Sequence, residues 1–270
     1  MASNKLEVSE LDFDAIKLNL KTFLQNQSEF QDYDFEGSGF AVLLDLLAYN
    51  THYLGFNANM LANEMYLDSA DIRKNIVSLA KMLGYTPTSS KAPSALLDIT
   101  MNNVTGNPAT ITAAKGTVFT TTVDGTSYQF VTNAETTISP SEGVYQFQSL
   151  EVFEGTLVTF KYTVDSSDVD QRFIIPSINA DTTTLKVSIQ NSASDTTTNT
   201  YSKATSFTSL NDESKVYFLQ ESDEGKFEVY FGDGIIGQSL TDGNIVLLEY
   251  VVTNMAQSNG ASSFALGSTV

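Results

Sequence analysis

The sequence predicts an α+β protein, in which a helical domain with one long helix precedes mainly antiparallel, β-sandwich-like modules. Residues 1–88 have the 3.6-residue periodicity of helices. From about residue 89 onward Thr, Ser, Asn and Gly become dense, and apolar residues come in short alternating runs. The 270 residues, 41% of them hydrophobic, can form two cores. We therefore expect a helical assembly domain at 1–88 and β-rich modules at 89–270, which a loop-rich stretch near 165–200 could divide.

Three helices are expected in the first domain. Ser9 with Asp12 resembles a capping box that opens a helix ending near Gln27. The stretch Ser38–Tyr66 contains no proline and predicts one long helix. A third helix is expected to begin at an N-cap Ser69 and to end at Gly84, before Pro87. Its apolar face would hold Ile72, Ile76, Leu79 and Leu83.

Seven segments of the second domain are the best strand candidates. They are Val118–Val123, Tyr128–Thr132, Leu157–Val164, Leu185–Gln190, Val216–Gln220, Phe227–Phe231 and Ile245–Val252. Asp124-Gly125, Glu142-Gly143 and Glu154-Gly155 are typical of the turns between them. The stretch Gln190–Thr200 is expected to be an exposed loop. Ser262–Val270 has no element of its own, so it either adds a short strand to a neighbour or leads into a longer protein.

The long helix has two apolar faces, whereas an ordinary surface helix has one. The first face carries Phe40, Leu43, Leu44, Leu47, Leu54, Ala58, Leu61 and Met65. The second, nearly opposite, carries Val42, Leu46, Tyr49, Tyr53, Phe56 and Met60. A narrow stripe of small and polar residues, Ala41, Asp45, Ala48, His52, Gly55 and Asn59, runs between them. We expect the flanking short helices to cover the first face.

The second face has the composition of an interface core, because Tyr, Phe and Met with a polar fringe are typical of one. We expect its central residues, Leu46, Tyr53 and Phe56, to meet a partner protein. The alternative is a contact of this face with the chain's own β-domain.

Charge and cysteine content exclude several classes of function. The formal net charge of −18 argues against a nucleic-acid or anionic-membrane surface, because phosphates require Lys and Arg. The absence of cysteine excludes disulfides, thiol nucleophiles and cysteine-based zinc sites. No secretory signal is recognisable, and the apolar stretch Phe40–Leu47 is too short to span a bilayer. A protein that is soluble and intracellular at synthesis is expected.

The residues that could carry chemistry do not form a convincing catalytic or cofactor site. His52 is the only histidine, so a triad or a histidine-rich metal site cannot be built around it alone. Asp165, Asp168 and Asp170 miss the EF-hand spacing, and a solvated acidic turn is the preferred interpretation. The carboxylates of Asp212–Glu228 could serve a glycosidase, but no Trp platform for sugar accompanies them. No catalytic residue, cofactor, metal or small-molecule substrate is expected.

A glycine-rich turn lies near the C-terminal end, at Gly232-Asp233-Gly234-Ile235-Ile236-Gly237. It satisfies G-x-G-x-x-G literally, but a dinucleotide site needs a helix after the glycines and a strand follows here. We expect the glycines to permit positive φ in a tight turn, with Asp233 accepting backbone N–H bonds.

Two regions carry a resemblance to a known family. The run Tyr230–Gly237 with its following strand resembles the hallmark of baseplate J-like proteins. Residues 34–87 are similar to the opening domain of the large baseplate wedge subunit of T4-like contractile-tailed bacteriophages. There a long helix precedes a motif that appears in this chain as Ser69, Ala70, Arg73, Ala80, Gly84 and Tyr85.

The resemblance implies a structural, non-enzymatic protein of the virion tail baseplate. Such subunits pair as homodimers, join other wedge proteins, link wedges into a ring around the tail hub and rearrange on sheath contraction. Assembly in the host cytoplasm is implied as well. T4-like versions are longer than this chain. The alternatives are a β-rich tail adhesin that binds glycans and a cell-wall hydrolase of the tail.

Overall fold

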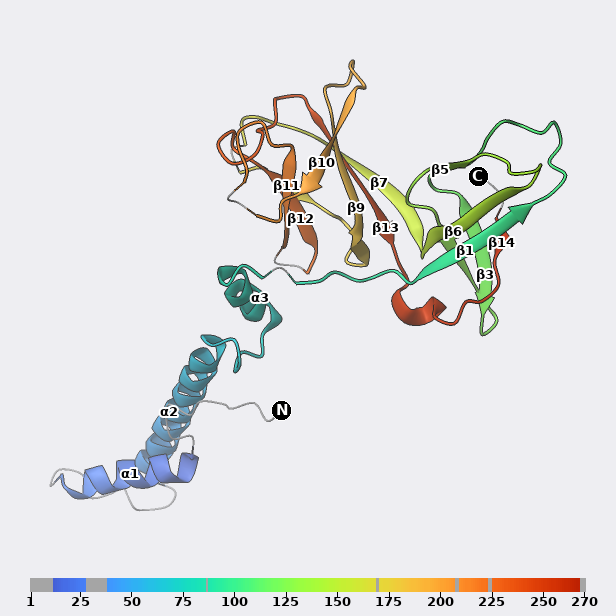
Figure 1. Ribbon diagram of the computed structural model, residues 1–270. Coiled ribbons are helices and arrows are strands. Elements are labelled where there is room, and N and C mark those ends of the chain that lie inside the picture. Colours follow the sequence, from blue (N-terminus) through green and yellow to red (C-terminus); the bar gives the residue numbers. More distant parts are fainter. Residues whose placement is uncertain are drawn as a thin grey trace. The chain divides into compact units, whose positions relative to one another are not determined.

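The computed structural model describes residues 12–27, 38–85, 87–168, 170–206, 209–222 and 225–267 (Figure 1). The chain forms two compact units, one ending at residue 86 and the other beginning at Pro87. The first unit is helical and the second consists of mostly antiparallel sheets, which confirms the predicted α+β class.

Helix α1 (Phe13–Gln25) begins one position after Asp12, which is its N-cap. The Asp12 carboxylate accepts hydrogen bonds from the backbone amides of Asp14 (2.8 Å) and Ala15 (3.0 Å). Asp12 therefore caps the helix directly instead of closing a capping box. The predicted partner Ser9 lies outside the described residues.

Helix α2 (Gly39–Glu64) is the long helix that the sequence predicts. The Ser38 hydroxyl caps it by accepting from the Ala41 amide at 3.0 Å. Its 26 residues extend about 39 Å, since each helical residue adds about 1.5 Å.

Helix α3 (Arg73–Met82) begins differently from the prediction. Its N-cap is Ile72, and the Ser69 hydroxyl instead donates to the Asn63 carbonyl at 2.8 Å. The Glu64 carboxylate accepts from the amides of Asp71 and Ile72, which precede the helix, and from the side-chain amide of Asn75. A carboxylate at the end of α2 thus holds the segment that enters α3, which has no side-chain cap.

The buried face of α3 also differs from the prediction. Val77 and Ala80 are its buried residues, whereas Ile72 and Leu83 are exposed. Gly84 follows the helix with φ of +77°, and the Tyr85 amide donates a hydrogen bond to the Ala80 carbonyl. The end of this helix at a left-handed glycine therefore matches the sequence pattern.

The first β-sheet has five strands in the order β1-β6-β4-β3-β14, and every paired neighbour is antiparallel. The strands are β1 (Ser94–Met101), β6 (Tyr145–Glu154), β4 (Thr126–Val131), β3 (Val118–Val123) and β14 (Ala265–Leu266). A two-stranded ribbon, β2 (Ile111–Ala113) with β5 (Thr136–Ile138), accompanies it. The buried core of the five-stranded sheet consists of Phe119, Phe130, Phe147, Leu150 and Val152.

The second sheet has seven strands in the order β7-β13-β9-β10-β11-β12-β8, of which only β10 and β11 pair in parallel. They are β7 (Thr156–Thr163), β13 (Ile245–Val252), β9 (Ala180–Gln190), β10 (Thr198–Lys203), β11 (Val216–Glu221), β12 (Phe227–Phe231) and β8 (Phe173–Ile174). The Tyr162 ring on β7 contacts Phe173 on β8, and its hydroxyl donates to the Ile174 carbonyl at 2.6 Å. The sheet therefore curls until its two edges meet around one core.

The structure bears on two expectations about the β-region and corrects the first. Residues 198–200, expected in a loop, belong to β10. Of the two alternatives for the last residues, the short strand is observed, because Ala265 and Leu266 pair with Thr120 and Phe119 of β3. The 3₁₀ helix η1 (Met255–Ser258) leads from β13 toward this last strand.

Candidate partner interface

Helix α2 buries very little of its surface. Its buried residues are Leu44, Ala48 and Asn59. Ala48 and Asn59 lie on the narrow stripe of small and polar residues, and Leu44 lies beside it. Asp45 on the same stripe forms an ion pair with Lys17 of α1, with a nitrogen–oxygen distance of 2.5 Å. Small side chains let two helix backbones approach closely, so α1 packs on this stripe.

The second apolar face of α2 is exposed along its length. The exposed fractions of its side chains lie between 46% and 63%, for Val42, Leu46, Tyr49, Tyr53, Phe56 and Met60. The rings of Tyr49 and Tyr53 stack with centroids 6.4 Å apart. One apolar surface therefore runs from Val42 to Met60. We call these six residues the aromatic face.

The first apolar face was expected to lie beneath the short helices, and this expectation is wrong for most of it. Leu44 is buried, but Leu43, Leu47, Leu54, Leu61 and Met65 are all more than half exposed. The reason is the packing of α1 against the neighbouring stripe of small residues. Helix α2 thus exposes apolar side chains on both sides.

The glycine-rich turn after β12 is held by backbone hydrogen bonds. The Asp233 carboxylate accepts from the amides of Ile235 (2.9 Å) and Ile236 (3.1 Å). Gly234 and Gly237 both have φ of +87°. A Cβ on Gly232 would lie 2.3 Å from the carbonyl oxygens of Ile236 and Gly237, so the turn has no room for a side chain there. The turn is closed on itself and is followed by no helix that could receive a phosphate.

We expect the order of this turn to depend on pH. The hydrogen bonds from Ile235 and Ile236 lower the pKa of Asp233 below its ordinary value. A lowered pKa means that the carboxylate stabilises the turn at neutral pH, and that this stabilisation is lost as pH falls through the pKa of the folded state. The amide resonances of Ile235 and Ile236, followed by NMR, should titrate at a pH below the usual range for Asp. In Asp233→Asn this titration should vanish; its persistence would assign it to another group.

The acidic candidates for chemistry have structural partners. Glu228 is 9% exposed, and its carboxylate accepts from Arg172 at 3.1 Å and from the Gln220 side chain. Arg172 also lies over the Tyr230 ring, 5.0 Å from its centroid. The Ser167 hydroxyl and amide both donate to Asp165 and lower the pKa of this carboxyl.

Among the described residues, no group of three or more His, Asp or Glu side chains is placed to hold a metal ion. His52 lies half-buried on the stripe of small residues in α2. In the part of the chain that the structure describes, none of the helices is both long and apolar enough to cross a bilayer.

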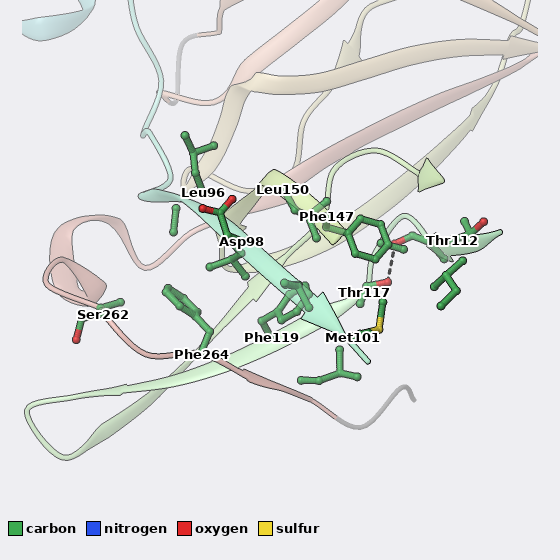
Figure 2. A pocket seen from close by; sticks show the side chains of 18 residues that line it. Leu96, Asp98, Met101, Thr112, Thr117, Phe119, Phe147, Leu150, Ser262 and Phe264 are labelled. Atoms are coloured by element: carbon green, nitrogen blue, oxygen red, sulfur yellow. Dashed lines mark hydrogen bonds between the residues drawn. The ribbon is translucent and has the colours of Figure 1, made fainter. Parts of the chain in front are cut away.

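An apolar groove of about 800 Å³ lies on the first β-sheet. Figure 2 shows the side chains of Met101, Phe119, Phe147 and Phe264 along it, with the Asp98 carboxylate at its rim. The Asp98 carboxylate accepts a hydrogen bond from the Ser149 amide at 2.8 Å, and the Thr117 hydroxyl donates to the Ala114 carbonyl at 2.7 Å. The sequence did not reveal this groove, because neither β1 nor β6 was among the predicted strands.

The helical unit matches a known family model. Residues 12–85, which contain the three helices, match the family model described as the helical domain of gp6-like baseplate wedge proteins. This helical region is therefore similar to the helical domain of baseplate wedge proteins.

The similarity extends beyond the helices. The chain is 30% identical over 276 aligned positions to the baseplate wedge protein gp6 of Enterobacteria phage T4. The alignment covers 96% of this chain and 40% of the T4 protein, so this chain spans less than half the length of that relative. The predicted resemblance to baseplate wedge subunits of T4-like phages is thereby confirmed.

Proposed function

We propose that the chain is a structural component of a phage tail baseplate wedge, and that it assembles through helix α2. It joins other wedge proteins and links neighbouring wedges into the ring around the tail hub. It pairs with a second copy in the full assembly and rearranges when the sheath contracts. Its place is the virion tail baseplate, after assembly in the host cytoplasm.

One observation carries this proposal: a helix of 26 residues buries three of them and exposes apolar side chains on two sides. A contiguous exposed apolar surface is unfavourable in water and is typical of a protein-binding site. The aromatic face, Val42, Leu46, Tyr49, Tyr53, Phe56 and Met60, is the part that we assign to a partner. Its Tyr and Phe side chains are typical anchors of such interfaces.

The role requires no bond-making step. The switch is a rigid-body change between alternative interfaces, with the β-unit as a spacer. A net charge of −18 disfavours nucleic acid as a partner. We assign the chain neither a catalytic residue nor a cofactor, a small-molecule substrate or a membrane-inserted segment.

Disruption of the gene in the phage that encodes the chain separates this function from the adhesin alternative. The lysate should contain no particles with complete contractile tails, because wedges cannot close into a ring. Negative-stain electron microscopy provides the measurement. Complete tails that fail to adsorb to host cells would instead favour a glycan-binding adhesin and would contradict the wedge role.

A further inference from the structure

The two β-sheets are joined where the chain passes between them three times. Residues 87–93 lie along the second sheet before β1 enters the first, Gly155 connects β6 to β7, and Thr253 follows β13 on the way back toward β14. Three crossings at separate points either allow the two sheets to bend relative to each other or hold them rigidly. Their hydrogen bonds decide between the two.

Glu154 lies at the centre of these crossings and is fully buried. Its carboxylate accepts from the Thr253 hydroxyl (2.6 Å), the Asn254 amide (2.9 Å) and the Asn254 side chain (2.7 Å). Its own amide donates to the Pro93 carbonyl at 2.8 Å. One residue therefore ties all three crossings together.

A second buried carboxylate secures the first crossing. Asp181 on β9 has no exposed surface, and it accepts from the Ala92 amide at 2.8 Å and from the Thr183 amide and hydroxyl. Ser89 and Thr182 add a hydrogen bond between their hydroxyls at 2.8 Å. Buried carboxylates are costly unless hydrogen-bonded, so a junction built from two satisfied ones resists opening.

Apolar and ionic contacts close the junction on its remaining sides. Val131 of the first sheet and Val251 of the second share one small core with Ala92. Lys115 forms an ion pair with Glu249 at 2.6 Å. The backbone carbonyl of Asn133 accepts a hydrogen bond from the Lys186 ammonium, and its side-chain amide donates to the Thr184 carbonyl.

We propose that Glu154 is the central tie of a clamp that makes the two β-sheets one rigid body. Opening the junction would separate the Glu154 carboxylate from its donors on Thr253 and Asn254, and the loss of these hydrogen bonds opposes hinge motion. A rigid β-unit transmits a displacement at one sheet to the other without bending. This inference concerns the β-unit alone and does not depend on the identity of its partners.

A distance measurement between the sheets tests the clamp. Because the chain has no cysteine, Ser127→Cys on β4 of the first sheet and Ala193→Cys in the exposed loop between β9 and β10 of the second provide two unique spin-label sites. Double electron–electron resonance on the full chain should give one narrow distance. Glu154→Ala should lose it, whereas Glu151→Ala, an exposed carboxylate on the same strand, should keep it.

Hydrogen exchange at Phe130 and Val187 reports whether each sheet stays folded in these variants. If Glu154→Ala does not fold, Asn254→Ala decides the question, because it removes one donor from an exposed residue. A broadened distance distribution with both sheets protected is the expected result. A broad distribution of the label distance in the parent chain would overturn the clamp. A distribution that stays narrow in Asn254→Ala and in any folded Glu154→Ala would overturn it as well.

Discussion

Gly155→Ala is expected to destabilise the β-unit by about 3 kcal/mol or more, because the new methyl group has no space. A Cβ at this position would lie 2.1 Å from the Val252 carbonyl oxygen and 2.9 Å from its carbonyl carbon. Gly155 also has φ of +121°, a backbone conformation that residues with a Cβ atom rarely adopt. Urea unfolding followed by circular dichroism provides the free energy.

Gly125→Ala is the matched control for this prediction. Gly125 has φ of +81° but nothing lies within 4 Å of its Cβ position. Its substitution should therefore cost only the left-handed conformation, about 1–2 kcal/mol. Equal losses in the two variants would mean that close packing at Gly155 contributes nothing.

Phe56→Ser is expected to weaken binding of the wedge partner strongly and to leave the stability of the isolated chain nearly unchanged. Phe56 is 51% exposed, so the monomer loses little packing, whereas a buried aromatic anchor contributes about 2 kcal/mol or more to an interface. This corresponds to an affinity loss of about 30-fold. Titration of the partner by calorimetry, with thermal unfolding of each chain alone, provides both numbers.

Leu61→Ser serves as the control, because Leu61 is 67% exposed on the opposite face of α2. It should leave the affinity for that partner unchanged. If Phe56→Ser instead unfolded the monomer without weakening assembly, the aromatic face would be an intramolecular surface.

Local periodicity was sufficient to predict much of the fold. The expected bounds of β3, β12 and β13 match the structure residue for residue, because each is a short run rich in β-branched, aromatic and apolar residues between turn signals. Strands β1 and β6 were missed for an identifiable reason. On β6, Ser149 has φ of +52° and the pairing register shifts opposite Leu97–Ile99, so the alternation breaks. On β1 the burial alternates regularly, but the exposed Leu96 beside Leu97 hides this alternation in the sequence.

The limits of prediction in the helical unit have a different origin. The start of α3 depends on Glu64, seven residues before the amide of Asp71 that it binds, and no local capping pattern records that contact. On α2 the sequence predicted two apolar faces. Which surface α1 would cover depends on the close approach that Ala48 allows, and this is a matter of tertiary packing.

The junction of the β-unit was only partly visible in the sequence. Glu154-Gly155 reads as a turn signal, and the chain does change sheet there. The hydrogen bonds of Glu154 reach Thr253 and Asn254, about a hundred residues further along the chain. No short-range pattern predicts such a contact.

Native mass spectrometry of the full chain, co-expressed with the proteins encoded beside it, tests most directly whether it is an assembly subunit. The account predicts a hetero-complex of defined stoichiometry that is retained in Leu61→Ser and lost in Phe56→Ser. A monomer that ignores its neighbours, or a complex that survives Phe56→Ser unchanged, would contradict assembly through the aromatic face of α2.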